Sequence, residues 1–237
     1  MNTWFEAGHV AIVTGGSRGL GKALAHELLI AGLHVIVDGR DPATLAEARA
    51  ELGGHGNVIA LAGDVTDLRH VHALVDAARK LGRLDLLVNN ASTLGETPLP
   101  RIDSISKATF DRLFDVNVFA PLHLIQHALP LMQAGTIVNI TSDAGVEAYP
   151  GWGGYGSTKA ALEHFSRVLA AELESSTLRV LVADPGDMNT QMHRDAIPDA
   201  DPGELRDPAE SARALMRAIA GLREPFERVR LAELVAA

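Results

Sequence analysis

Six short apolar runs, rich in β-branched residues, recur along the chain, and a segment of helix length follows each of them. Strands joined through helices pair in parallel, and right-handed crossovers place those helices on both faces of the sheet. The pattern therefore predicts an α/β fold with a doubly wound parallel sheet of the Rossmann type. The predicted strands are His9–Thr14, His34–Val37, Asn57–Ala62, Leu84–Asn89, Thr136–Thr141 and Leu178–Ala183.

The 237 residues suffice for one α/β domain, and no linker, repeat or low-complexity tract divides them. We therefore expect a single domain over residues 1–237. The segment 185–208 differs from the rest because it carries four prolines and many acids but little periodic pattern. It predicts a long loop with a short helix at most, at the sheet edge where ligands bind. We expect it to be a substrate lid, and an insert without a functional role is the alternative.

Composition argues against several classes of function. The formal net charge of −9 leaves no basic surplus for nucleic acid or an anionic membrane, and no apolar stretch approaches the roughly 18 residues of a membrane span. The ten histidines form no metal-ligand motif, and the absence of cysteine removes disulfides and thiolate sites. We expect a cytoplasmic protein without a metal, a nucleic-acid partner or a membrane segment.

The first predicted strand leads into TGGSRGLG, which contains Gly15, Gly19 and Gly21 directly before a strong helical pattern. Glycines permit a tight turn and a close approach of the backbone, and a helix N-terminus offers free N–H groups to a pyrophosphate. This stretch therefore predicts a phosphate-binding loop. Further along, GGYGSTKAALEHF places Tyr155 and Lys159 one helical turn apart, so that their side chains can meet. For an isolated pair, a solvated lysine near a helix start would be the ordinary interpretation.

The spacing T-G-x-x-x-G-x-G resembles that of the short-chain dehydrogenase/reductase family, in its compact single-domain branch. Other motifs of that family follow in order over about residues 9 to 190: GDVTD with Asp64, NNAS, VNVF with Asn117, ITSDAG with Ser142, and YGSTK with Tyr155 and Lys159. The resemblance implies an oxidoreductase that transfers a hydride between NAD(P)(H) and a carbonyl or alcohol. A catalytically silent nucleotide-binding sensor is the alternative.

The resemblance also implies a catalytic tetrad of Asn117, Ser142, Tyr155 and Lys159. Tyr155 would be the general acid and base, and Lys159 would lower its pKa and bind the ribose hydroxyls. Ser142 would donate a hydrogen bond to the substrate oxygen, and Asn117 would bind a water that links Lys159 to solvent. Taken alone, Ser142 could be a strand-end cap and Asn117 a buried polar group of a helix.

The expected cofactor contacts come from the glycine loop, the ends of the strands and the start of the late segment. Asp64 is expected beside the adenine, although a turn cap would explain it as well. The sequence departs from the family at Ser92, where glycine is usual, at Asp184 and Asp187, and in its C-terminal end. The expected cofactor residues are Gly15, Ser17, Arg18, Gly19, Leu20, Gly21, Arg40, Asp64, Val65, Asn90, Ala91, Tyr155, Lys159, Pro185, Gly186, Met188 and Thr190.

The stretch VIVDGRD leaves two interpretations of cofactor preference. Asp38 could accept hydrogen bonds from an adenosine ribose, which favours NAD(H). The family pattern instead places Gly39 at the acidic position, with Arg40 after it and Arg18 as a second basic residue. Two guanidinium groups would bind a 2′-phosphate by charge-assisted hydrogen bonds, so that NADP(H) is favoured and NAD(H) is the alternative.

The expected partner is a small carbonyl or alcohol, mainly apolar or aromatic. Binding sites of this kind are apolar with a few orienting polar groups, and the loops at the expected site carry several large apolar residues, although core packing explains them nearly as well. The resemblance further implies a homotetramer, or a dimer, paired through the helices that contain Asn117 and Tyr155. The large apolar residues of those loops are Leu94, Tyr149, Trp152, Met188 and Met192.

Overall fold

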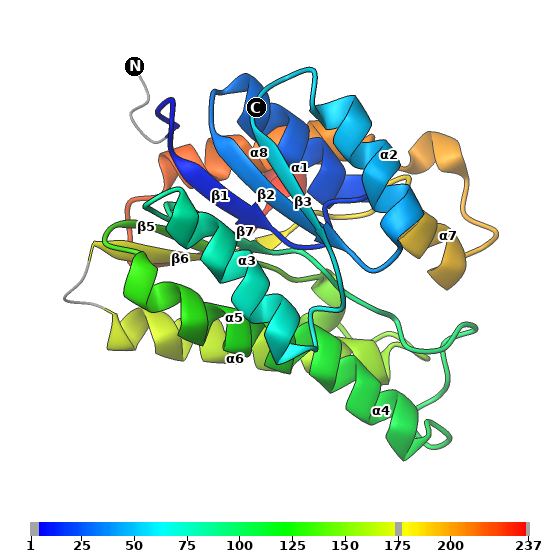
Figure 1. Ribbon diagram of the computed structural model, residues 1–237. Coiled ribbons are helices and arrows are strands. Elements are labelled where there is room, and N and C mark those ends of the chain that lie inside the picture. Colours follow the sequence, from blue (N-terminus) through cyan, green and yellow to red (C-terminus); the bar gives the residue numbers. More distant parts are fainter. Residues whose placement is uncertain (1–4, 174–176, 236–237) are drawn as a thin grey trace.

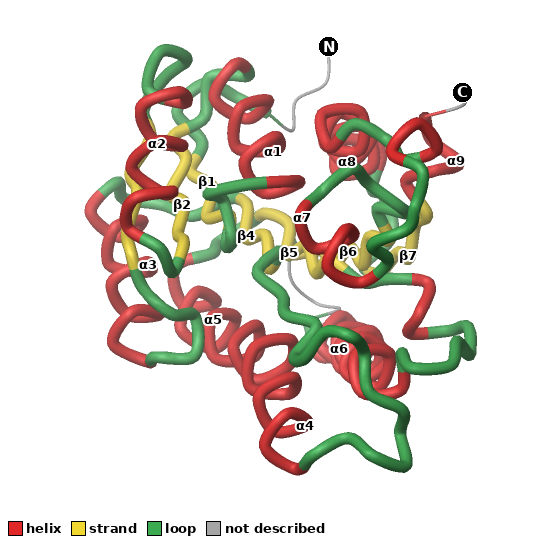
Figure 2. Tube along the Cα trace, turned by 90° about the vertical axis from the view of Figure 1, so that its right-hand side faces the viewer, coloured by secondary structure: helices red, strands yellow, loops and turns green. Residues whose placement is uncertain are grey.

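The computed structural model describes residues 5–173 and 177–235. Its centre is one parallel sheet of seven strands in the order β3-β2-β1-β4-β5-β6-β7, with helices on both faces (Figures 1 and 2). This confirms the doubly wound fold and the single domain. The strands are β1 (Val10–Val13), β2 (His34–Gly39), β3 (Val58–Ala62), β4 (Leu86–Asn89), β5 (Gly135–Ile140), β6 (Leu178–Asp184) and β7 (Phe226–Arg230).

The seventh strand, β7, corrects the expected number of six. Its sequence FERVR carries three charged residues among five, and among the described strands it pairs with β6 alone, from Val180↔Phe226 to Asp184↔Arg230. An interior strand of a parallel sheet is buried on both faces and reads as a continuous apolar run, whereas an edge strand need not be. An apolar run in the sequence therefore does not mark this strand.

Alternate residues of β1 enter two different hydrophobic cores. Ala11 and Val13 face one core with α1 and α8, and Val10 and Ile12 face the other with α3 and α5. Figure 2 shows α1, α2, α8 and α9 on one side of the sheet and α3, α5 and α6 on the other. The helices are α1 (Gly19–Ile30), α2 (Pro42–Leu52), α3 (Leu68–Lys80), α4 (Lys107–Phe114), α5 (Ala120–Ala128), α6 (Gly153–Glu172), α7 (Gln191–Ala196), α8 (Pro208–Gly221) and α9 (Leu231–Val235).

The late segment, residues 185–208, leaves the end of β6 and returns to the start of α8. It contains the short helix α7 and one 3₁₀ turn, Pro202–Glu204. Its two ends are joined, because Met188 and Arg206 form a parallel bridge and the Asn189 N–H donates to the Arg206 carbonyl at 2.8 Å. In the described part of the chain no helix is both long and apolar enough to cross a membrane.

Candidate active site

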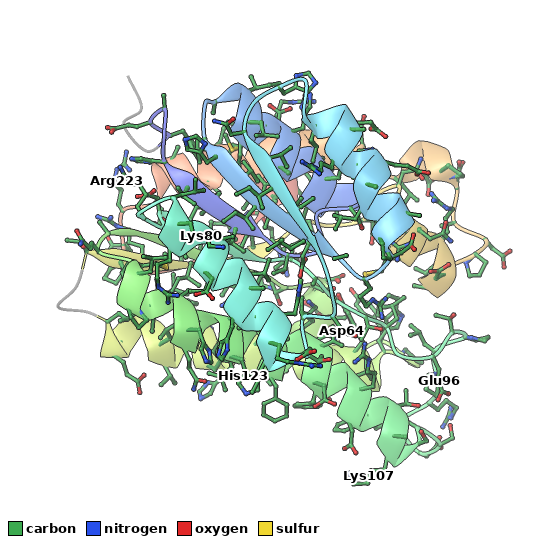
Figure 3. The ribbon with its side chains drawn as sticks, viewed as in Figure 1. Asp64, Lys80, Glu96, Lys107, His123 and Arg223 are labelled. Atoms are coloured by element: carbon green, nitrogen blue, oxygen red, sulfur yellow. The ribbon has the colours of Figure 1, made fainter. Side chains whose placement is uncertain are left out.

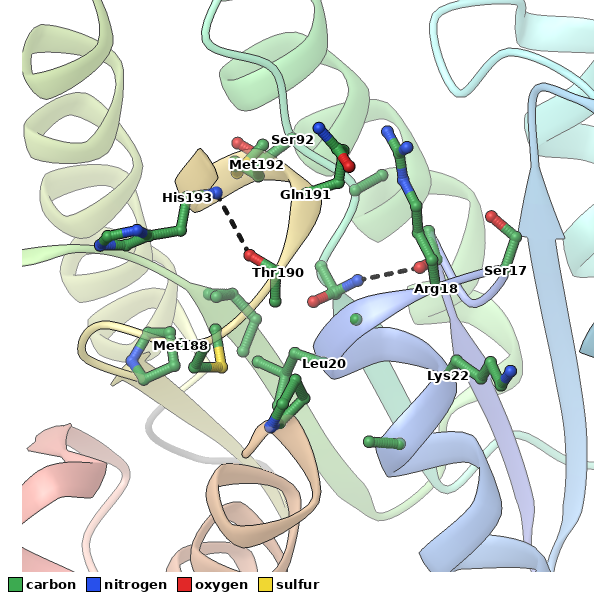
Figure 4. A pocket seen from close by; sticks show the side chains of 18 of the residues that line it. Ser17, Arg18, Leu20, Lys22, Ser92, Met188, Thr190, Gln191, Met192 and His193 are labelled. Atoms are coloured by element: carbon green, nitrogen blue, oxygen red, sulfur yellow. Dashed lines mark hydrogen bonds between the residues drawn. The ribbon is translucent and has the colours of Figure 1, made fainter. Parts of the chain in front are cut away.

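A cavity of about 1000 Å3 lies at the carboxyl edge of the sheet. Its wall combines the glycine loop, the ends of the strands, the start of α6 and the late segment. In Figure 4, Met188 and Thr190 of the late segment lie opposite Leu20 and Arg18 at the start of α1. Of the expected cofactor residues, all but Gly21 line this cavity; of the expected tetrad, all but Asn117 do.

The glycine loop has the conformation that a phosphate cradle needs. Gly15 and Gly19 have φ of 66° and 55°, in the left-handed region that favours glycine, and the N-cap of α1 has no side-chain capping bond. Gly21 serves packing, because a Cβ there would approach the Gly15 carbonyl oxygen to 2.4 Å and Asn90 Nδ2 to 2.5 Å. The loop thus leaves backbone N–H groups free, and its geometry fits the pyrophosphate of a dinucleotide.

Asp38 at the end of β2 is buried and points back into the protein. It is 1% exposed. Its Oδ1 accepts a hydrogen bond from the Gly15 N–H at 2.6 Å, and its Oδ2 is 3.0 Å from His70 Nε2. Both carboxylate oxygens are therefore engaged by the protein itself.

Arg18 and Arg40 are exposed at the rim of the same cavity. Within the described residues, neither of them takes part in an ion pair. Two unpaired guanidinium groups at this end of the cavity form a site that suits an anionic group.

Asp64 lies beyond the end of β3, close to α4 (Figure 3). Its Oδ1 accepts hydrogen bonds from the N–H and the hydroxyl of Thr66, and its Oδ2 accepts one from Arg112 at 2.8 Å. Burial opposes ionisation, but the bonds from Thr66 and Arg112 outweigh it and lower the pKa of Asp64 to about 2. Asp64 thus caps a turn and also lines the cavity.

Tyr155 and Lys159 meet on the first turns of α6, as their spacing predicts. The Lys159 Nζ lies 5.3 Å from the centroid of the Tyr155 ring and donates a hydrogen bond to the Ile140 carbonyl at 2.9 Å. Burial lowers the pKa of Lys159 to about 8, and Glu163 opposes this effect. Burial also raises the pKa of Tyr155 above its usual range; a hydrogen bond with Ser92 opposes the rise, and Asp184 adds to it.

Ser142 stands two residues after the end of β5, at the wall of the cavity. Its hydroxyl donates to Asp143 Oδ1 at 2.9 Å and accepts from the Ala144 N–H at 3.2 Å. Ser142 therefore caps the short 3₁₀ helix Asp143–Gly145, and it lies close enough to Tyr155 to oppose the rise in the pKa of that residue. The structural and the catalytic interpretation of this residue are compatible.

Asn117 lies in a π-helical segment, Asp115–Phe119, between α4 and α5. Its Oδ1 accepts from the Ser92 hydroxyl and the Thr93 N–H, and its Nδ2 donates to the Thr93 carbonyl and to Thr158 Oγ1. The side chain thus links the loop after β4 to helix α6. It shares no hydrogen bond with Lys159 among the described residues.

Two residues of this centre were not assigned a role from the sequence. Ser92 donates a hydrogen bond to Asn117 and lies near Tyr155, and in the sequence it stands out as a serine where the family has glycine. Glu163 is buried one helical turn after Lys159. In the sequence it stands out because it is an acid on the apolar face of a helix. Within the described residues, no group of three or more His, Cys, Asp or Glu side chains could hold a metal ion.

The cavity wall next to Tyr155 is mainly apolar. Leu94, Trp152 and Met192 belong to one cluster with Tyr155, and the rings of Trp152 and Tyr155 are 5.8 Å apart in an edge-on arrangement. The contact orients the Tyr155 ring and lines the space next to its hydroxyl with apolar surface.

Comparisons with known proteins agree with this geometry. Residues 9–201 match the family model of short chain dehydrogenases. Benzil reductase ((S)-benzoin forming) IRC24 of Saccharomyces cerevisiae is 37% identical over 202 residues, which cover 79% of this chain and 74% of the relative.

Two solved structures are similar over nearly the whole length. A 7α-hydroxysteroid dehydrogenase complexed with NADH and 7-oxo glycochenodeoxycholic acid has a TM-score of 0.85 and 28% identity, covering 97% of this chain and 94% of its own. A short chain dehydrogenase from Burkholderia cenocepacia in complex with NADP has a TM-score of 0.85 and 25% identity, covering 94% of this chain and 96% of its own. The chain therefore belongs to the short-chain dehydrogenase/reductase family and is an NAD(P)-dependent oxidoreductase that acts on a CH–OH or C=O group.

Proposed function

We propose that the protein transfers a hydride between NADP(H) and a carbonyl or alcohol substrate, with Tyr155 as the general acid and base. The observation that carries this proposal is the position of Lys159 Nζ, 5.3 Å from the Tyr155 ring centroid, inside the cavity that the glycine loop also lines. The nicotinamide of the bound cofactor supplies or accepts the hydride. In reduction, the Tyr155 hydroxyl gives its proton to the substrate oxygen.

The neighbouring groups adjust the proton affinity of Tyr155. Without a charged partner its phenolate would be costly in this buried place, and a protonated Lys159 stabilises it. The Ser142 hydroxyl donates to the substrate oxygen as negative charge develops there. Asn117 orders the surroundings through its four hydrogen bonds.

We propose NADP(H) as the preferred cofactor. Arg18 and Arg40 are available for a 2′-phosphate, whereas both oxygens of Asp38 are engaged by Gly15 and His70, which leaves Asp38 poorly placed as a ribose ligand. The charge-assisted bonds of a guanidinium to a phosphate are roughly twice as strong as neutral hydrogen bonds. The other proposed cofactor residues are those of the cavity wall named above.

We propose a mainly apolar or aromatic substrate. The cluster of Leu94, Trp152 and Met192 beside Tyr155 supports this, as does the similarity to a reductase named for benzil. The late segment, residues 185–208, would act as a lid over cofactor and substrate.

The test is a turnover screen of purified protein with NADPH and with NADH against benzil, simple ketones, aldehydes and quinones. We expect NADPH oxidation that depends on an apolar or aromatic carbonyl and is faster than with NADH. Binding of NADPH without turnover of any compound would favour a nucleotide sensor instead.

We further propose a homotetramer, with a dimer as the alternative, and a cytoplasmic location. Phe119, near Asn117, and Val168 on α6 are 46% and 44% exposed, so that apolar side chains are available for pairing through these two helical segments. Sedimentation as a monomer at micromolar concentration would contradict the assembly. The absence of cysteine is compatible with a reducing compartment, and cell fractionation tests the location.

A further inference from the structure

A largely buried ion pair, with Arg228 20% exposed, lies next to Lys159 and outside the lining of the cavity. Glu163 follows Lys159 by one turn of α6 and is 6% exposed. Its Oε2 accepts a hydrogen bond from Nε of Arg228 at 2.9 Å, and its Oε1 accepts one from the Thr141 hydroxyl at 2.7 Å. A carboxylate, a guanidinium and a hydroxyl from α6, β7 and the end of β5 therefore meet at one point.

Arg228 extends this arrangement to β6. One of its terminal nitrogens is 3.9 Å from Asp184 Oδ2, and that same nitrogen is buried and has no hydrogen-bond partner among the described residues. Buried ion pairs seldom add stability, because desolvation offsets their attraction, and an apolar replacement is often neutral or better. Stabilisation of the fold is therefore a weak explanation for Glu163 and Arg228. Their position beside the catalytic residues points to a role in the reaction.

Residues that contact this ion pair, and Glu163 itself, are close neighbours in the chain of residues of the catalytic centre. Thr141 precedes Ser142, Glu163 is one turn from Lys159, and Asp184 precedes the Pro185–Gly186 wall of the cavity. We propose that Glu163, held by Arg228, is a positioning residue that keeps Lys159 protonated in its buried place and fixes the strand end that carries Ser142. The inference rests on the proposed function, in which Lys159 acts as a cation.

Other charged groups around Lys159 do not replace Glu163. The titratable neighbour of Lys159 on α6, apart from Glu163, is Tyr155. The sheet contributes Asp143 after β5, Asp184 at the end of β6, and Arg228 and Arg230 on β7. On the elements packed against the start of α6, Arg112 pairs with Asp64, Lys107 pairs with Asp111, and Asp115 is exposed. Among all these groups, Glu163 is the acid that raises the pKa of Lys159 against the effect of burial.

The test measures Lys159 directly in the cofactor-free protein. The chain has four lysines, so that ¹³C labelling at the lysine ε-carbon gives four titration curves, and Lys159→Met identifies the one that belongs to Lys159. In Glu163→Gln we expect the Lys159 midpoint to fall by about one pH unit, because this variant removes an opposite charge one helical turn away. The alkaline limb of the kcat/KM profile should move in the same direction.

Glu172→Gln is the matched control, because it makes the same change at an exposed position of the same helix. We expect it to leave the Lys159 titration unchanged. A midpoint in Glu163→Gln equal to that of the wild type would overturn the inference.

A double variant, Glu163→Leu with Arg228→Met, replaces the pair by apolar side chains of similar size and guards against misfolding of the single variant. It too should lower the Lys159 midpoint, and an unchanged value in it would also overturn the inference. Should the wild type show no turnover, the proposed function fails, but the titration still decides the role of Glu163.

Discussion

The carboxylate of Asp38 and the backbone N–H of Gly15 are joined by a 2.6 Å hydrogen bond, which ties the end of β2 to the glycine loop. Asp38→Ala removes this acceptor and also leaves His70 without its partner. We expect weaker binding of NADPH and of NADH alike, because the cradle for the pyrophosphate common to both loses its support. Titration calorimetry with the two cofactors measures this. A wild type that prefers NADH, with a preference that Asp38→Ala relaxes, would make Asp38 a ribose ligand instead.

Arg40→Ala should affect NADPH selectively. We expect a loss of roughly 1.5–3 kcal/mol in NADPH binding, the cost of a hydrogen bond to a charged group, which is about a 10- to 100-fold rise in KM. The KM for NADH should stay nearly constant. Arg69→Ala is the matched control, because Arg69 is an exposed arginine whose ion pair is with Asp67, outside the cavity wall. Equal changes for both cofactors in Arg40→Ala would contradict the assignment.

Tyr155→Phe should abolish most turnover while the fold and cofactor binding persist. It removes a single hydroxyl and retains the ring that packs against Trp152. We expect kcat to fall by about 10²–10⁴-fold, as when a general acid and base is lost. Steady-state kinetics and NADPH titration provide the measurements. Turnover near that of the wild type would exclude Tyr155 from this role.

The fold could largely be predicted from the sequence, because interior strands of a parallel sheet must be apolar on both faces. Strand β7 could not be predicted in this way, because an edge position tolerates charged residues such as Glu227, Arg228 and Arg230. The π-helical segment around Asn117 was also beyond sequence reasoning, because no periodic pattern reveals one wide turn within a helix.

The site was predictable where a motif fixes both residue type and spacing, as for Tyr155 and Lys159. Contacts between distant segments, such as Asp38 with His70 or Glu163 with Arg228, have no such local signal. The sequence alone left open whether Asp38 would face a ribose, and that orientation depends on how the glycine loop folds back onto β2.

The late segment should become resistant to protease when cofactor and substrate bind. Trypsin can cut within residues 185–208 only after Arg194 and Arg206. Arg206 belongs to the bridge with Met188, whereas Arg194 is exposed on α7, so that we expect the first cut after Arg194. Saturating NADPH and substrate should slow this cut, as measured by mass spectrometry of the fragments. Equal rates with and without ligands would rule out a lid.

Stability should depend on pH through Lys159. Burial lowers its folded-state pKa to about 8 from 10.5, so that between these values the unfolded chain binds more protons and the free energy of unfolding rises with pH. The full effect is on the order of 3 kcal/mol. Urea unfolding of the cofactor-free protein at pH 7.5 and at pH 10 measures most of it. Lys159→Met should remove this rise; a variant with the same slope as the wild type would contradict the buried lysine.

The bridge between Met188 and Arg206 joins the two ends of the late segment to each other. Residues 189–205 depart and return at neighbouring positions, and lengthening a closed loop costs little free energy, because the cost grows only with the logarithm of its length. The segment is consequently an exchangeable cassette, which evolution or engineering can lengthen, shorten or transplant while β6 and α8 keep their places. Under the proposed lid role, such changes would alter the substrate range while Tyr155 and Lys159 keep their places on α6.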